Sequence, residues 1–234
     1  MAHGGAIVGS IDEAAACVDY PTLVAVDGLR YAIPASLAFA IFWMWKWDAL
    51  AHRRIQARRP SRKAFAREIR YSISTTLIFA GVGWCIAWLV ERGVFELYAD
   101  VDLYGWPYWF GSLAIAIVFH DAYFYWTHRA MHHPVLFRTF HRVHHLSTSP
   151  SPWAAYAFAP PEAVIEALVL PALLLLLPMH HLALFAFLLY MIVRNVIGHL
   201  GIELYPRWFA RSRITRHMTT STHHNLHHRD LRGN

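Results

Sequence analysis

Apolar residues gather along the chain in long runs that are separated by shorter polar stretches. The runs cover residues 31–45, 71–90, 106–126 and 163–193. A helix of roughly 20 apolar residues crosses the hydrocarbon core of a bilayer. Each of the first three runs therefore predicts one membrane span, the first extending back toward Leu23. The sequence PMHH at residues 178–181 interrupts the last run, which predicts a tight hairpin of two spans. We expect an all-α, polytopic membrane bundle of four to five spans.

Basic residues are concentrated in two of the polar stretches, and this asymmetry predicts an orientation. Nine Lys and Arg lie between Lys46 and Arg70, and six Arg lie between Arg207 and Arg232. The loop after the second run holds four acidic residues and Arg92 alone. Because Lys and Arg favour the cytosolic side of a membrane, both basic stretches are predicted to be cytosolic. The membrane is either a bacterial inner membrane or that of the endoplasmic reticulum.

Composition supports a membrane protein and disfavours other classes. Hydrophobic residues make up 56% of the chain and charged residues 15%, whereas soluble domains carry about 25% charged residues. The net charge is +6, but the basic residues flank apolar segments, so no nucleic-acid partner is expected. Cys17 and Cys85 form no CxxC pair, so neither a disulfide framework nor a thiolate metal site is predicted.

The chain has 17 histidines, and their spacing is more informative than their number. Residues three and four positions apart lie on one face of a helix. The segments HRAMHH, HRVHH and HHNLHH, which begin at His128, His141 and His223, each satisfy this relation. An even number of predicted spans separates the first two segments from the third, so all three lie on the same side of the membrane. We expect them to form a histidine-rich helical cap on the cytosolic face.

This many imidazoles close together predict bound metal. Crowded histidines would partly charge and repel one another, and a cation bound to them keeps them neutral. Imidazole is a ligand of zinc, copper, iron and nickel. One zinc ion takes three or four protein ligands, so eight or more converging histidines favour a two-metal site. His199 leaves the last span on the same side and joins the candidates. The histidines interpreted as structural or surface residues are His3, His52, His180, His181 and His217.

Residues 106–234 resemble a known family over more than half the chain. The segments that carry the likeness are HDAYFYWTHRAMHHPVLFRTFHRVHH, PSPWAAYAF, GHLGIELYP and THHNLHHRDLRGN. Their order and the text between them resemble the fatty acid hydroxylase/sterol desaturase superfamily, closest to its bacterial sterol-desaturase-like branch. The domain organisation that we predict is an N-terminal membrane region at 1–105 and a fatty acid hydroxylase/sterol desaturase domain at 106–234.

The resemblance implies a membrane-bound oxidoreductase with two iron ions, although zinc could occupy the site in purified protein. Such an enzyme uses O2 and two electrons from an external cytochrome or ferredoxin to hydroxylate or desaturate a lipid, which reaches the metals through a hydrophobic tunnel. The implied metal ligands are His128, His132, His133, His141, His144, His145, His199, His223, His224, His227 and His228. His120 and Asp121 are further possible site residues.

Two departures from the family pattern and two rival functions accompany this reading. The family usually has His-Pro where this chain has Ala159-Pro160, and it continues past the position of Asn234, so the domain is expected to be truncated.

A degenerate membrane protein that keeps a structural zinc site is the first alternative function. A metal transporter is the second, but its ligands would lie near the bilayer midplane. The sequence leaves open a sterol, hopanoid, carotenoid, fatty acyl or ether lipid substrate.

Overall fold

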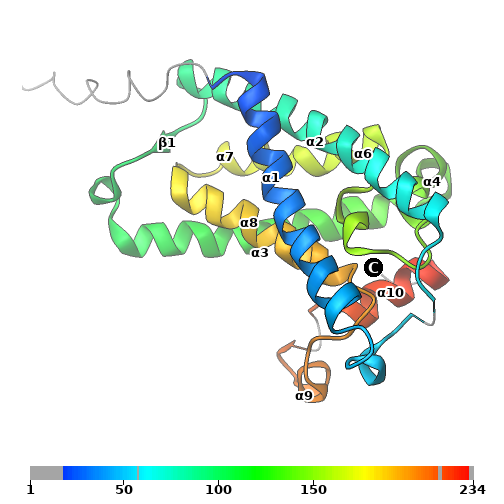
Figure 1. Ribbon diagram of the computed structural model, residues 1–234. Coiled ribbons are helices and arrows are strands. Elements are labelled where there is room, and N and C mark those ends of the chain that lie inside the picture. Colours follow the sequence, from blue (N-terminus) through cyan, green and yellow to red (C-terminus); the bar gives the residue numbers. More distant parts are fainter. Residues whose placement is uncertain (1–17, 57, 216–217, 232–234) are drawn as a thin grey trace, which may run out of the picture.

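Four long helices and their connections form the body of the protein in the computed structural model, which describes residues 18–56, 58–215 and 218–231 (Figure 1). They are α1 (Tyr20–Ala38), continued by a π-helix (Phe39–Trp45), α2 (Arg62–Glu91), α3 (Gly105–Met131) and α8 (His181–Gly198). All four helices run between the two ends of the molecule. One end contains β1 (Leu97–Tyr98), and the other contains α4 (Pro134–Phe140) and α10 (Ser221–Asp230).

Local sequence explains where the long helices begin. The Asp19 side chain accepts a hydrogen bond from the backbone N–H of Thr22 at 2.8 Å, ahead of α1. The hydroxyl of Ser61 accepts one from the N–H of Ala64 at 3.2 Å, ahead of α2. Such side-chain caps satisfy N–H groups that have no partner within the first helical turn. Many large apolar side chains of these helices, such as Leu29, Ile33, Ile73 and Trp84, are exposed on the outside of the bundle.

The structure confirms a helical membrane bundle but modifies the expected spans. Within the described residues, three helices are long and apolar enough to cross a membrane, namely Tyr20–Trp45, Arg62–Glu91 and His181–Gly198. The third expected span is the 27-residue α3, which is long enough but carries polar residues such as His120, Asp121 and His128 in its second half. The expected fourth span is instead two short helices, α6 (Pro160–Ala167) and α7 (Val169–Leu174). We attribute the break to Pro171, which lacks the N–H that a continuous helix requires there.

The end of the molecule opposite α10 is closed by a short parallel pair of strands. β1 pairs with β2 (Met179–His180), with Leu97 opposite Met179 and Tyr98 opposite His180. The predicted interruption at residues 178–181 is therefore real and contains a short strand that leads directly into α8. The ring nitrogen Nε2 of His180 contacts the Ala99 carbonyl at 2.8 Å, so this histidine holds the pairing together, as its structural interpretation predicted.

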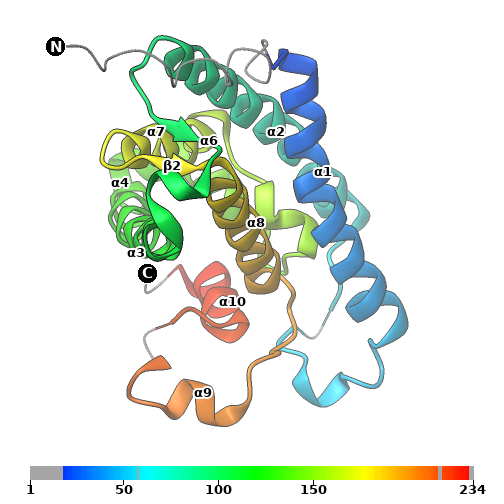
Figure 2. The same cartoon turned by 90° about the vertical axis from the view of Figure 1, so that its left-hand side faces the viewer.

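Short helices at the other end form the cap, and Figure 2 shows one of them, α10, below α8. They are α4, α5 (Arg142–His145), α9 (Arg207–Arg211) and α10. The Thr220 hydroxyl caps α10 by accepting from the N–H of His223 at 3.3 Å, and Ser221 donates to the Ile197 carbonyl at 2.8 Å, which ties α10 to the end of α8. The turn after α8 contains Gly201, whose φ of +69° disfavours other residues. A Cβ at this position would also lie only 2.7 Å from the side chain of Gln56.

Candidate metal centre

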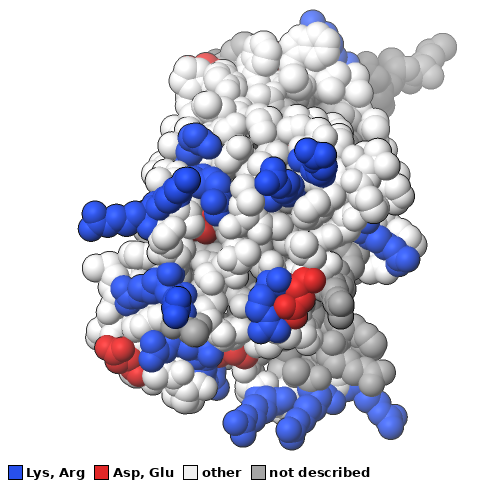
Figure 3. Space-filling view, turned by 90° about the vertical axis from the view of Figure 1, so that its right-hand side faces the viewer, with Lys and Arg blue, Asp and Glu red and all other residues white. Residues whose placement is uncertain are grey.

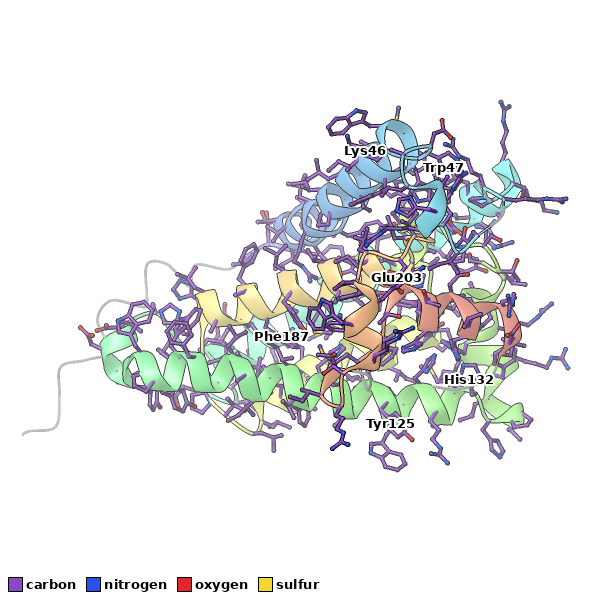
Figure 4. All side chains as sticks on the ribbon, turned by 90° about the horizontal axis from the view of Figure 1, so that it is seen from below. Lys46, Trp47, Tyr125, His132, Phe187 and Glu203 are labelled. Atoms are coloured by element: carbon purple, nitrogen blue, oxygen red, sulfur yellow. The ribbon has the colours of Figure 1, made fainter. Side chains whose placement is uncertain are left out.

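The cap brings nine histidines from four separate segments into two compact groups. In each group, one possible ligand atom per residue lies within 4.8 Å of all the others. The first group is His128, His132, His141, His145 and His227. The second group is His144, His199, His224 and His228. Figure 4 shows His132 at the end of α3, beside α10. The end of α3, α5, the residue after α8 and α10 therefore build the site together.

Distances between ring nitrogens match those of ligands that share an ion. In the first group, His132 Nε2 lies 3.1 Å from His227 Nε2 and 3.2 Å from His145 Nε2. In the second, His224 Nε2 lies 3.0 Å from His199 Nε2 and 3.1 Å from His228 Nε2. Nitrogens bound at 2.0–2.1 Å to one ion lie roughly 2.8–3.4 Å apart when they are neighbours in an octahedral or tetrahedral geometry. Both groups therefore have the dimensions of a coordination sphere.

Burial keeps these imidazoles neutral, as metal ligands must be. Seven of the nine, all but His132 and His224, are buried. Burial lowers the pKa of His132 to about 4, with a further contribution from His227. It lowers the pKa of His145 to about 2 and that of His199 to about 4. Desolvation disfavours the charged imidazolium, and neighbouring imidazoles add repulsion, so lone pairs stay available for a cation at neutral pH.

Unsatisfied ring nitrogens and an all-imidazole donor set fit bound metal. Nε2 of His141 is buried without a hydrogen-bond partner among the described residues. Its other nitrogen, Nδ1, lies 2.5 Å from Oε1 of Glu162 on α6, and both side chains are buried. A carboxylate on the second nitrogen of a ligating histidine fixes the ring orientation and raises its basicity. Glu162 thus positions His141 so that Nε2 faces the first group.

Glu162 was not predicted from the sequence, although a signal for it existed. Glu162 and Glu166 are one helical turn apart in an otherwise apolar stretch, and charged residues in such segments are usually functional. Burial raises the pKa of Glu162 well above its usual range, with repulsion from Glu166 adding to the effect, and burial raises the pKa of Glu166 to about 8. Only the fold reveals that Glu162, and not Glu166, meets His141.

Four predicted site residues lie outside both groups. His133 is exposed and caps α4, its Nδ1 accepting from the N–H of Val135 at 3.4 Å. His223 is exposed because it lies on the side of α10 that faces away from the two groups. His120 and Asp121 line an adjacent cavity and belong to neither group. His3 and His217, interpreted as structural, lie outside the described residues.

An apolar cavity of about 300 Å³ leads to the second group. Its walls come from α1, α2, α3, α6, α7 and α8, and His224 stands at its cap end. Phe187 lines it between α3 and α8 (Figure 4), together with Phe79, Phe124 and Leu170. Binding cavities of this size and character commonly hold apolar ligands. The fold and the site thus define a helical membrane protein with two groups of histidines, each able to hold a metal ion, at one end of an apolar cavity.

Comparison with known proteins agrees with that class. The chain belongs to the fatty acid hydroxylase family, which matches residues 113–234. This confirms the predicted superfamily, while the bacterial branch stays a prediction. No solved structure matches the chain.

Curated relatives match more than half of the chain. Delta(7)-sterol 5(6)-desaturase ERG3B of Gibberella zeae is 35% identical over 58% of this chain and 41% of its own length. Delta(7)-sterol 5(6)-desaturase erg3C of Aspergillus fumigatus is 30% identical over 58% of this chain and 48% of its own. Lathosterol oxidase of Rattus norvegicus is 27% identical over 70% and 54%. The chain spans about half the length of the curated relatives it matches.

Proposed function

We propose that the protein is a membrane-bound, O2-dependent oxidoreductase that holds two iron ions and hydroxylates or desaturates a lipid. The observation that carries this proposal is the junction of two histidine groups with an apolar cavity at His224. The family membership and the names of the relatives, which are sterol desaturases and a lathosterol oxidase, support oxidative chemistry on a lipid. The domain boundary near residue 105 also stays a proposal.

The metal ions would be held by the nine histidines of the two groups. Bound iron supplies the oxidising power that an unactivated C–H bond requires, in reaction with O2 and two electrons. The residues of the chain do the rest. Glu162 keeps His141 in one orientation, and the apolar walls around Phe187 keep water from the reacting carbon. The cavity aligns a lipid so that one of its carbons lies beside His224.

Charge distribution supports a cytosolic cap and an acidic electron donor. Figure 3 shows Lys and Arg spread over the cap end of the molecule, with few Asp and Glu among them. Exposed basic residues at this end include Arg58, Arg59, Arg62, Lys63, Arg70, Arg129, Arg138, Arg142, Arg207, Arg211, Arg213 and Arg229. Cytosolic loops are rich in Lys and Arg, and complementary charge accelerates the encounter with an acidic cytochrome or ferredoxin.

Metal analysis and lipid analysis together test the proposal. The purified full chain is expected to contain about two irons, and membranes that contain it are expected to convert a supplied lipid only with O2 and a reductant. A variant with His144→Ala and His145→Ala should lose both metal and turnover while the chain stays helical by circular dichroism. One tightly held zinc without any turnover would instead support the degenerate structural site, and ions carried across vesicles would support a transporter.

A further inference from the structure

A second buried glutamate, Glu68 on α2, lies close to the histidine-bearing cap. Its side chain is fully buried, although α2 is one of the helices apolar enough to cross a membrane. Oε2 of Glu68 accepts a hydrogen bond from the Ser151 hydroxyl at 2.5 Å. Oε1 is buried and has no hydrogen-bond partner among the described residues. A buried acceptor left without a donor is unfavourable, so packing alone does not explain this side chain.

The carboxyl group lies beside the loop of residues 146–151, which directly follows α5 and its ligand His144. Two further side chains hold this loop from the same side. Arg67 of α2 donates to the first carbonyl of the loop at 2.7 Å. Nε2 of Gln56 donates to the Pro150 carbonyl at 3.0 Å. The N-terminal region therefore fixes the backbone that comes immediately after the histidines of α5.

The turn that carries His199 is held by the same part of the chain. The side chain of Gln56 packs directly against Gly201. Nε1 of Trp43 donates to the carbonyl of the residue after His199 at 2.9 Å. His199 and the histidine that precedes the loop both belong to the second group. Side chains between residues 43 and 68 thus contact both segments that meet in the second group.

Three buried polar atoms at the end of α5 lack partners and complement one another. Nε2 of His144 faces the second group, since it lies 3.3 Å from Nε2 of His199. An ion bound at that nitrogen leaves Nδ1 of His144 as an N–H donor, and Nδ1 is buried without a partner among the described residues. The Ser147 hydroxyl, which can donate and accept, is likewise buried and unpartnered there, and it lies near the Glu68 carboxylate. The N–H of Ser147 donates to the His144 carbonyl at 3.2 Å, which keeps both residues in one turn.

We propose that Glu68 is a positioning residue for the metal ion of the second group, acting on His144 through Ser147, an inference that rests on the proposed function. Nδ1–H of His144 donates to the Ser147 hydroxyl, and that hydroxyl donates to Oε1 of Glu68, so all three atoms gain partners. A carboxylate behind a ligating histidine fixes the ring and raises its basicity. Glu162 does this for His141 directly, and Glu68 does it across one hydroxyl. Each ion then has a buried glutamate of its own, from α6 for the first and from α2 for the second.

Release of zinc from the purified full chain tests this role without any turnover. The metal-free chain is loaded with zinc in detergent, and the zinc is withdrawn by titration with a chelator. Glu68→Gln replaces the carboxyl group with an amide of the same size, and Ser147→Ala removes the linking hydroxyl. Each variant should release one of its two ions at about a tenfold lower chelator concentration, the lower end of the effect of such partners. The double variant should match either single variant, because one shared chain of hydrogen bonds is broken in every case.

The identity of the affected ion and a matched control separate positioning from a general loss of structure. His199→Ala removes a ligand of the second group only. In that background, Glu68→Gln should leave the release of the remaining ion unchanged. The control is Ser72→Ala, which removes another hydrogen bond from α2, donated to the Trp153 carbonyl at 3.0 Å. This variant should release both ions as wild type does. If Glu68→Gln does not fold by circular dichroism, Ser147→Ala, with and without His199→Ala, decides the question.

Several outcomes would overturn the role of Glu68. They are wild-type zinc release from either single variant, effects of Glu68→Gln and Ser147→Ala that add, an equal effect of Ser72→Ala, and a weakened ion that remains in the His199→Ala background. Lipid oxidation together with wild-type zinc release from Glu68→Gln would remove this role and leave the proposed function standing. One weakened zinc ion in a chain that oxidises no lipid would keep this role and remove the proposed function.

Discussion

The contact between Glu162 and His141 allows a sharp test of the metal centre. Glu162→Gln keeps the size of the side chain and its ability to accept a hydrogen bond, but replaces the ionisable carboxyl group 2.5 Å from Nδ1 of His141 with an amide. Loss of a carboxylate on a ligating histidine typically weakens metal binding 10–100-fold, or about 1.4–2.7 kcal/mol. Because both side chains are buried, solvent does not screen the interaction, and we expect an effect in the upper half of this range.

Only one of the two metal ions should be affected. His141 belongs to the first group, whereas the second group has no ligand that touches Glu162. The assay measures metal released from the purified full chain as a chelator is titrated. In wild type two ions should leave at high chelator concentration. In Glu162→Gln one ion should leave at a 10–100-fold lower concentration, and the other at the wild-type value.

The matched control is Glu166→Gln on the same helix. Glu166 is also buried, lies one turn from Glu162 and forms no ion pair with a histidine among the described contacts. This variant should release both ions as wild type does. The reasoning is refuted if Glu162→Gln releases its metal like wild type, or if Glu166→Gln weakens one ion equally. Circular dichroism of both variants checks that the helices are intact.

Three further outcomes follow from the structure. His144→Ala and His145→Ala alter neighbouring residues in different groups, so each should weaken a different ion while the double variant loses both; equal loss of the same ion from both single variants would contradict the grouping. Gly201→Ala introduces a side chain at φ +69° and 2.7 Å from Gln56, and should lower the free energy of unfolding by at least ~1 kcal/mol, measured by thermal unfolding in detergent against Gly111→Ala. In metal-free protein, His199 has a pKa of about 4 in the folded state and 6.5 as its ordinary value. Only the unfolded chain takes up this proton as pH falls from 6.5 to 4, so stability should fall by about 1.4 kcal/mol per pH unit in that window and stay constant for this group above pH 7.5.

Hydrophobic patterning was sufficient to predict most of the long helices but not their full arrangement. The runs at 71–90 and 106–126 lie inside α2 and α3, and the first run does extend back past Leu23 into α1. The apolar run that begins at residue 163 was expected to cross the membrane before residue 178. It forms α6 and α7 instead, because apolar composition alone does not distinguish one span from two short helices that are packed inside the bundle.

The sequence by itself determined that the chain is a helical membrane protein with imidazoles on one face of several short segments, because helical periodicity and hydropathy are local properties. Only the tertiary structure decided how those imidazoles divide. His144 and His145 enter different groups because adjacent residues on a helix point about 100° apart, and the packing of α8 and α10 then assigns His199 and His228 to one side. Packing likewise turned His133 outward and brought Glu162 to His141. Contacts between residues distant in sequence depend on how helices pack against one another, which no local pattern encodes.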